Sequence, residues 1–87
     1  MLSLYKTSDF EEGFKKLPRE IKSLFYKQEK IFSNHWLDPR LHVKRIKELS
    51  GAYSFRITRR YRVFFYFQNP EKAIFFFVGH RKDAYSI

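Results

Sequence analysis

The 87-residue sequence has no cysteine, only three glycines and three prolines, and half as many acidic as basic residues. Without cysteine, neither a disulfide framework nor a thiolate zinc site can form, and a cysteine nucleophile is excluded. Three glycines are too few for a glycine-rich phosphate loop, and no serine lies in a G-x-S-x-G turn. No stretch approaches the ~20 apolar residues of a membrane span. We also expect no signal peptide, so the sequence predicts a cytoplasmic protein without a membrane partner.

The scarcity of acidic residues also argues against a metal cofactor. Residues 31–87 contain only Asp38, Glu48, Glu71 and Asp83, and no two of them have ligand spacing on one element. Metal-dependent nucleases need clustered carboxylates to bind hard cations. Three histidines without cysteine do not make a structural zinc site. We therefore expect neither a metal nor another cofactor.

Aromatic residues are abundant, with eleven Phe, six Tyr and one Trp making up 21% of the chain. The length predicts one domain over residues 1–87, because most domains hold roughly 100–150 residues and no linker is present. Each buried aromatic side chain removes roughly 150–250 Å² from water, which offsets the small size of such a domain. We expect these residues to supply the core, including Phe75, Phe76 and Phe77 in the most apolar stretch.

The positive charge is concentrated in the second part of the chain. The net charge is +9, with a pI near 10.0; residues 1–30 contribute +2 and residues 31–87 contribute +7. Between Arg40 and Arg62 there are eight basic residues and one acid, Glu48. Such a basic stretch indicates a nucleic-acid partner. General solubility charge is the alternative, and a membrane-surface role is disfavoured because the stretch lacks a basic amphipathic helix.

The first half of the sequence has the pattern of a strand followed by two helices. Residues 2–5 suit a short strand, and Ser8 begins a capping-box signature for a helix start. Pro18 ends this first helix and opens a second one. Residues 21–32 repeat apolar side chains at helical spacing, with Gln28 as the polar exception. The short linker predicts an antiparallel two-helix hairpin.

The second half changes to the two-residue period of strands. Residues 53–58, 61–68 and 73–78 predict a meander of three antiparallel strands. Together with the first half, this order is an α+β fold, with one twisted sheet and the helices on one face. Arg56 and Arg62 are then expected on the opposite face of the sheet.

These arginines suit a cleavage of RNA that requires no metal. The 2′-OH can attack the adjacent phosphate if a base removes its proton, an acid protonates the leaving oxygen and cations stabilise the charge. Arg56, Arg62 and Arg81 are candidates for the cations, because the guanidinium binds phosphate bidentately. His80 is the candidate acid or base, since histidine ordinarily titrates near neutrality.

Other residues of the basic stretch are candidates for binding RNA, and Tyr66 or Tyr85 for stacking on a base. Each candidate also has a purely structural interpretation. Strand arginines and basic turns are often only solvated, and a lone histidine lies on a surface more often than in an active site. The candidate RNA-binding residues are His42, Lys44, Arg45, Lys47, Arg59, Arg60 and Lys82.

Three blocks of the sequence form a distinctive series: LSGAYSFRIT at residues 49–58, YRVFF at residues 61–65 and VGHRKDAY at residues 78–85. Together they resemble the RelE/ParE toxin superfamily. Their order and spacing are most similar to the RelE/StbE and YafQ-like branch of mRNA interferases. The resemblance covers essentially the whole chain.

The resemblance implies a RelE-like fold and the toxin of a type II toxin–antitoxin system. Such toxins are metal-independent, ribosome-dependent endoribonucleases that cleave mRNA in the A site by attack of the 2′-OH. The implied partners are an acidic cognate antitoxin and the ribosome with its mRNA, contacted through 16S ribosomal RNA. The toxin–antitoxin complex is further expected to bind operator DNA through the antitoxin.

The resemblance also implies roles for particular residues. Arg56 resembles a basic residue that stabilises or activates the attacking group, and Arg62 and Arg81 resemble phosphate-binding arginines. His80 resembles the histidine that serves as acid, and Tyr85 resembles a tyrosine that stacks on a base. Two departures stand out, since Ser54 replaces a lysine of RelE and no carboxylate matches the general base of YoeB-like toxins. His42 is the provisional candidate for that base.

Two other functions compete with this hypothesis. One is a non-catalytic inhibitor of DNA gyrase, like the ParE branch, and the other is a degenerate toxin that only binds antitoxin as a repressor module. The histidine and arginine after the last strand favour an enzyme, because a gyrase inhibitor has no evident need for an acid and a cation there.

Overall fold

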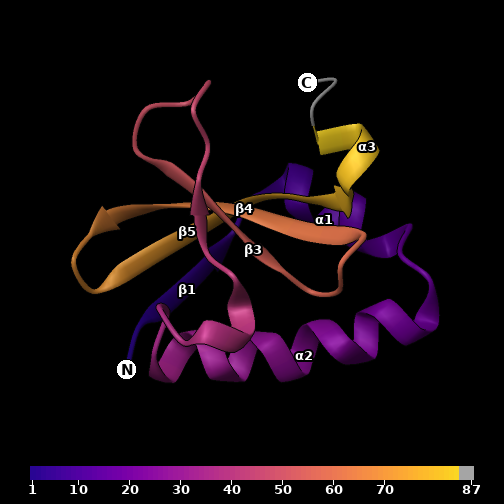
Figure 1. The fold of residues 1–87 in the computed structure, drawn as a ribbon, viewed down its shortest axis with the longest axis horizontal. Coiled ribbons are helices and arrows are strands. Elements are labelled where there is room, and N and C mark those ends of the chain that lie inside the picture. Colours follow the sequence, from indigo (N-terminus) through magenta and orange to yellow (C-terminus); the bar gives the residue numbers. More distant parts are fainter. Residues whose placement is uncertain (85–87) are drawn as a thin grey trace.

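The computed structural model describes residues 1–84 as a mixed sheet with helices. The sheet order is β1-β5-β4-β3-β2, with β1 parallel to β5 and the other neighbours antiparallel. Figure 1 shows α2 crossing one side of this sheet and α3 lying on the other side. The elements are β1 (Ser3–Lys6), α1 (Ser8–Lys15), α2 (Arg19–Asn34), the short 3-10 helix η1 (Pro39–Leu41), β2 (Lys44–Arg45), β3 (Ala52–Arg56), β4 (Tyr61–Asn69), β5 (Lys72–His80) and α3 (Arg81–Ala84).

The predicted α+β fold is confirmed, with a first strand, two helices and a β3–β4–β5 meander in one sheet. Three short elements were not predicted, namely η1, β2 and α3. β2 has only two residues, which pair with Ser54 and Tyr53 of β3, and α3 has four. Elements this short carry no periodicity that a sequence pattern can reveal.

The two helices begin and end slightly differently from the prediction. Thr7, and not Ser8, caps α1, because its Oγ1 accepts a hydrogen bond of 3.2 Å from the backbone N–H of Phe10. α1 ends before Leu17, which is nevertheless buried in the core. Pro18 is the N-cap residue of α2, just before its first turn.

The core between the helices and one face of the sheet combines aromatic rings with aliphatic side chains, and its largest buried side chains are phenylalanines. Phe32 from α2 lies at its centre, with its ring centroid 4.8 Å from that of Phe65 and 5.2 Å from that of Phe75. Trp36 closes one end against Phe67, at 4.9 Å between ring centroids. The fully buried phenylalanines are Phe10, Phe25, Phe32, Phe55, Phe65 and Phe75.

Two phenylalanines of β5 lie outside this core, next to a β-bulge. Phe64 pairs with Phe77 and Phe65 pairs with Phe75, so Phe76 is an extra residue in β5. Phe76 and Phe77 are only half-buried, and both rings contact Phe64 on the face away from the helices. The assignment of all three neighbouring phenylalanines to the core was therefore wrong for Phe76 and Phe77.

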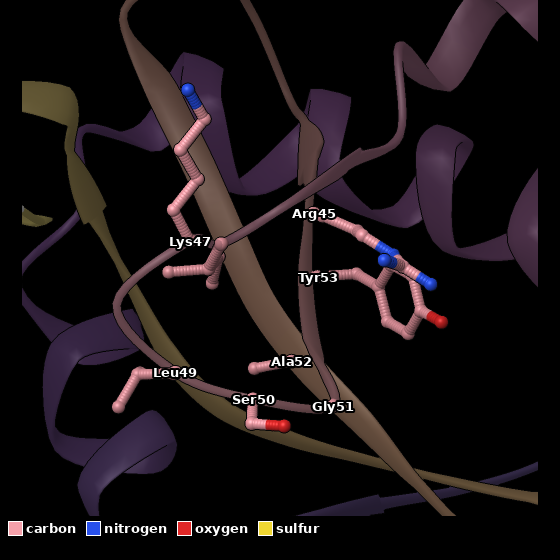
Figure 2. A pocket seen from close by; sticks show the side chains of 8 residues that line it. Arg45, Lys47, Leu49, Ser50, Gly51, Ala52 and Tyr53 are labelled. Carbon is pink, nitrogen blue, oxygen red and sulfur yellow. The ribbon is translucent and has the colours of Figure 1, made fainter.

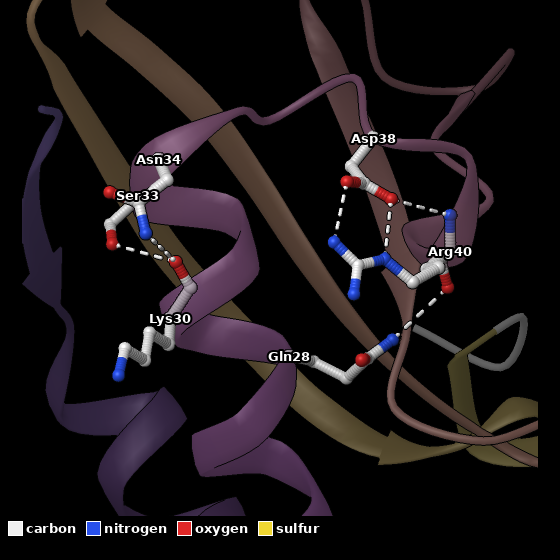
Figure 3. A network of polar contacts seen from close by, with 6 residues as sticks. All are labelled: Gln28, Lys30, Ser33, Asn34, Asp38 and Arg40. Atoms are coloured by element: carbon white, nitrogen blue, oxygen red, sulfur yellow. Dashed lines mark hydrogen bonds and ion pairs between the residues drawn. The ribbon is translucent and has the colours of Figure 1, made fainter.

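Gln28 ties α2 to the end of β3. Its side-chain amide donates hydrogen bonds to the carbonyl oxygens of Arg56 at 2.9 Å and Arg40 at 3.2 Å; Figure 3 shows the second of these bonds. Arg40 is itself held by Asp38, whose carboxylate accepts from its backbone N–H and its guanidinium. These hydrogen bonds hold the pKa of the Asp38 carboxyl well below its usual range. Gln28, the polar residue in the apolar stripe of α2, thus positions the backbone of Arg56.

Replacing Gln28 by leucine is expected to lower the free energy of unfolding by about 1–2 kcal/mol, because two carbonyl groups lose their donor. Urea denaturation of the purified protein measures this change. The exposed Ser23→Ala on the same helix is the control, with an expected change below about 0.5 kcal/mol. Equal stability of Gln28→Leu and the unchanged protein would show that these bonds do not hold β3.

Candidate nucleic-acid interface

Arg56 and Arg62 face each other on the side of the sheet opposite α1 and α2, which we call the open face. They are paired in register between β3 and β4, and Arg62 is paired with Gly79 of β5. Both Nε atoms are buried, and neither has a hydrogen-bond partner in the part of the chain that the structure describes. Within residues 1–84, no ion pair involves either arginine.

This arginine pair is unfavourable by itself. Like charges directly opposite one another on adjacent strands repel, and a buried donor without an acceptor costs free energy. A phosphate bound between Arg56 and Arg62 would remove both penalties, because each guanidinium can donate two hydrogen bonds to its oxygens. The pair therefore has the chemistry of an anion-binding site.

A basic groove of about 200 Å³ adjoins the pair, between the β2–β3 connection and the open face. Lys44 enters it because its pairing with Ser54 places both residues on the open face. The groove combines three cations from β2 and its following loop with Arg62 from β4. Its lining residues are Lys44, Arg45, Ile46, Lys47, Glu48, Ser54, Arg62 and Phe64.

Glu48 is the functional candidate that the sequence pattern did not reveal. It lies in the wall of the basic groove together with Arg62, and none of the ion pairs described for residues 1–84 includes it. Its signal in the sequence is its position as the one acid between Arg40 and Arg62. His42, the provisional candidate for the base, is instead exposed after η1 with a left-handed φ of 50°.

Arg45 and Lys47 line a second pocket, formed by the β2–β3 connection, but their side chains point in different directions (Figure 2). Figure 2 shows the side chain of Arg45 beside Tyr53 and that of Lys47 pointing away from both. Arg45 is paired in register with Tyr53, whose ring stacks on Phe65 of the core. Although Arg45 borders the basic groove, its side chain thus leans toward the helical side of the sheet.

Further cations gather at the end of the sheet next to the arginine pair. Arg59 and Arg60 are exposed in the β3–β4 turn, where Oγ1 of Thr58 accepts a hydrogen bond from Arg60 N–H at 3.2 Å. The backbone N–H of Arg81 donates to the carbonyl oxygen of Arg60 at 2.7 Å, which brings α3 to this end. Arg81 and Lys82 are also exposed. We call Arg59, Arg60, Arg81 and Lys82 the basic end.

His80 is not brought beside the arginine pair. It pairs with Tyr61, and the two rings meet edge to face at 5.3 Å between centroids. Strand alternation places His80 with the core residue Val78 on the helical side, opposite to Arg62. Its Nδ1 accepts a hydrogen bond of 3.1 Å from the backbone N–H of Lys82, so the proton of the neutral ring is on Nε2.

The remaining sequence predictions concern Tyr85, metals and membranes. Tyr85 lies outside the described residues, so its predicted stacking role stays a prediction. The described part of the chain contains no group of three histidine or acidic side chains that could hold a metal ion. Nor does any helix within it have the length and apolar character needed to cross a membrane.

Comparisons with known proteins show which fold this chain shares. No family model and no curated protein sequence matches the chain. Among solved structures, the RelB–RelE antitoxin–toxin complex from Methanococcus jannaschii matches at a TM-score of 0.76 with 25% identity, covering 94% of this chain and 95% of that one. A RelBE toxin–antitoxin complex from Mycobacterium tuberculosis matches at 0.75 with 23% identity, covering 92% of this chain and 98% of that one.

YafQ from E. coli is a more distant match in sequence, with 10% identity and a TM-score of 0.77, covering 98% of this chain and 99% of that one. The likeness to RelE noted in the three sequence blocks is thus confirmed in the structure. Over nearly its whole length, this chain has the RelE-like fold and is a structural match to the RelE, YafQ and ParE toxins of type II toxin–antitoxin systems.

Proposed function

We propose that this protein is the toxin of a type II toxin–antitoxin system and a metal-independent endoribonuclease that cleaves mRNA in the ribosomal A site. The observation that carries the proposal is the Arg56–Arg62 pair, whose buried Nε atoms have no hydrogen-bond partner within residues 1–84, beside a basic groove that contains a carboxylate. The match to RelB–RelE over 94% of the chain supports it. Charge alone would support only the binding of RNA or DNA.

The groove suggests how the residues divide the reaction. Arg56 and Arg62 hold the scissile phosphate and stabilise the charge of the pentavalent intermediate. Glu48, which lines the groove with Arg62, takes the proton from the attacking 2′-OH. The 2′-oxygen then bonds to phosphorus and the 5′-oxygen leaves, giving a cyclic phosphate and a free 5′-OH after protonation.

His80 remains the proposed donor of that last proton, through Nε2. The His80 ring lies at the end of β5, on the opposite face of the sheet from Arg62. This role therefore requires the leaving oxygen to lie at the basic end. Arg81, whose backbone bonds to Arg60 there, is proposed to contact the same phosphate group. Further exposed cations are proposed to bind flanking phosphates and 16S ribosomal RNA. They are Lys44, Lys47, Arg59, Arg60 and Lys82.

An acidic antitoxin is the proposed protein partner. The solved complexes from Methanococcus jannaschii and Mycobacterium tuberculosis each contain an antitoxin with the toxin. A net charge of +9 favours an acidic partner that neutralises the open face. Binding of operator DNA by the complex is then proposed to occur through the antitoxin.

Controlled expression in bacteria, with sequencing of the 5′ ends of ribosome-bound mRNA, tests this function. We expect arrested growth and new ends within codons, at ribosome-occupied positions. Intact mRNA with a DNA-damage response would identify a ParE-like gyrase inhibitor instead. Normal growth together with tight binding of a co-expressed antitoxin would indicate a degenerate module, and either result would overturn the proposal.

A further inference from the structure

The open face also carries a row of aromatic rings that the proposed cleavage does not use. Tyr66 lies on β4 four residues beyond Arg62 and keeps 42% of its surface exposed. Its ring is 5.7 Å from that of Phe76, which is 6.1 Å from that of Phe64. These three residues and Tyr5 form what we call the aromatic row.

Tyr5 extends the row across the sheet to its edge. It pairs with Ile74 in β1–β5, and Ile74 pairs with Tyr66 in β5–β4, so all three point to the open face. Tyr5 is 55% exposed, and the Nζ of Lys72 lies 5.4 Å from the centroid of its ring. The row thus begins next to one cation, Arg62, and ends at another.

Two cations with two exposed rings between them, Tyr66 and Tyr5, are the pattern of a surface for single-stranded nucleic acid. Phosphates pair with cations, and every base offers a π-face on which an aromatic ring can stack. Arg62 and Tyr66 are four residue steps apart on β4, roughly 13 Å, so both can contact one short RNA segment. The bulge at Phe76 contributes by turning an additional ring toward the open face.

We infer that the aromatic row is a stacking path for the RNA segment adjacent to the cleaved phosphate, with Tyr66 as its main platform. The inference rests on the proposed function, because it places the scissile phosphate at the arginine pair. A structural role for Tyr66 would need only its contact with Phe76. Its exposed ring and the cations at both ends of the row favour a nucleic-acid ligand.

The test is fluorescence anisotropy of the purified full chain with a short labelled single-stranded RNA, 2′-O-methylated to prevent cleavage. Tyr66→Ala is expected to weaken binding about ten-fold, the usual effect of losing one stacked base. Tyr66→Phe should bind like the unchanged protein, whereas Tyr66→Leu should resemble Tyr66→Ala because it has no π-face. Tyr26→Ala removes a tyrosine that is 57% exposed on α2 and should have no effect.

The salt dependence separates stacking from charge. For Tyr66→Ala, the slope of log affinity against log salt concentration should equal that of the unchanged protein, since no phosphate contact is lost. For Arg62→Gln, the slope should fall by about 0.7, as expected for one phosphate contact on a single strand. Thermal unfolding of each variant controls for a loss of folded protein.

The inference is overturned if Tyr66→Ala binds RNA like the unchanged protein, or if Tyr66→Leu restores full binding. It is also overturned if the unchanged protein does not bind the RNA, or if the row proves to bind only a protein partner. In each case the proposed function is judged separately, by mRNA cleavage in cells. Cleavage without an effect of Tyr66→Ala would remove the stacking path and leave the nuclease.

Discussion

Arg62→Gln is expected to reduce mRNA cleavage about 100-fold or more while leaving the protein at least as stable as before. The loss follows from removing one of the two cations proposed to stabilise the phosphorane. The retained stability follows because Arg62 opposes Arg56 in register and its Nε has no hydrogen-bond partner within residues 1–84, so repulsion and a desolvation cost are both relieved. Cleavage of ribosome-bound mRNA and thermal unfolding measure the two effects.

Two further variants test whether the loss of activity is specific to the position and the guanidinium group of Arg62. Lys27→Gln removes the same charge from the exposed face of α2 and should retain full activity. Arg62→Lys keeps the charge but loses the bidentate fork, so its activity should lie between that of the unchanged protein and that of Arg62→Gln. Full activity of both Arg62→Gln and Arg56→Gln would show that the arginine pair is not the active face.

Gly13→Ala is expected to destabilise the protein by about 2–3 kcal/mol, although alanine favours helices over glycine by up to about 1 kcal/mol. A Cβ at Gly13 would lie 2.7 Å from the carbonyl oxygen of Val78. That oxygen belongs to the backbone of β5 and cannot rotate away, so α1 would have to move off the sheet. Denaturant unfolding and the near-ultraviolet signal of the core aromatics would report the change.

Glu12→Ala is the matched control for this substitution. Glu12 is the exposed residue that precedes Gly13 in α1, so its replacement should change stability by less than about 0.5 kcal/mol. A Gly13→Ala protein that is as stable as the unchanged one would mean that α1 does not pack on β5 at this distance. Because His80 follows Val78 by two residues, the variant should also disturb its position at the end of β5.

The side of the sheet on which most strand residues lie was predictable from the sequence. Alternation along residues 53–68 separated Phe55 and Phe65 from Arg56 and Arg62, and the structure confirms this separation. The reason is local, since successive side chains of a strand point to opposite faces. The concentration of charge after Arg40 is likewise a property of the sequence alone.

Other parts of the site depended on how distant segments meet. Glu48 lies near Arg62 because the β2–β3 connection folds over the open face. A two-residue strand such as β2 has no sequence pattern from which this path could be predicted. The bulge turns Phe76 away from the core through a mismatch between β4 and β5, which neither strand shows by itself. His80 and Arg62 are candidates for the same reaction, but the register of β4 and β5 places His80 on the helical side with Tyr61.

The sequence by itself therefore determined the α+β elements, the aromatic core and the cationic character of the open face, because these follow from periodicity and composition within single segments. The tertiary structure alone decided which groups lie together on the open face, because strand register and loop path depend on contacts between segments far apart in the chain. The pair of Arg56 and Arg62 depends on both the sequence and the tertiary structure. Alternation pointed each arginine outward, and register placed one opposite the other.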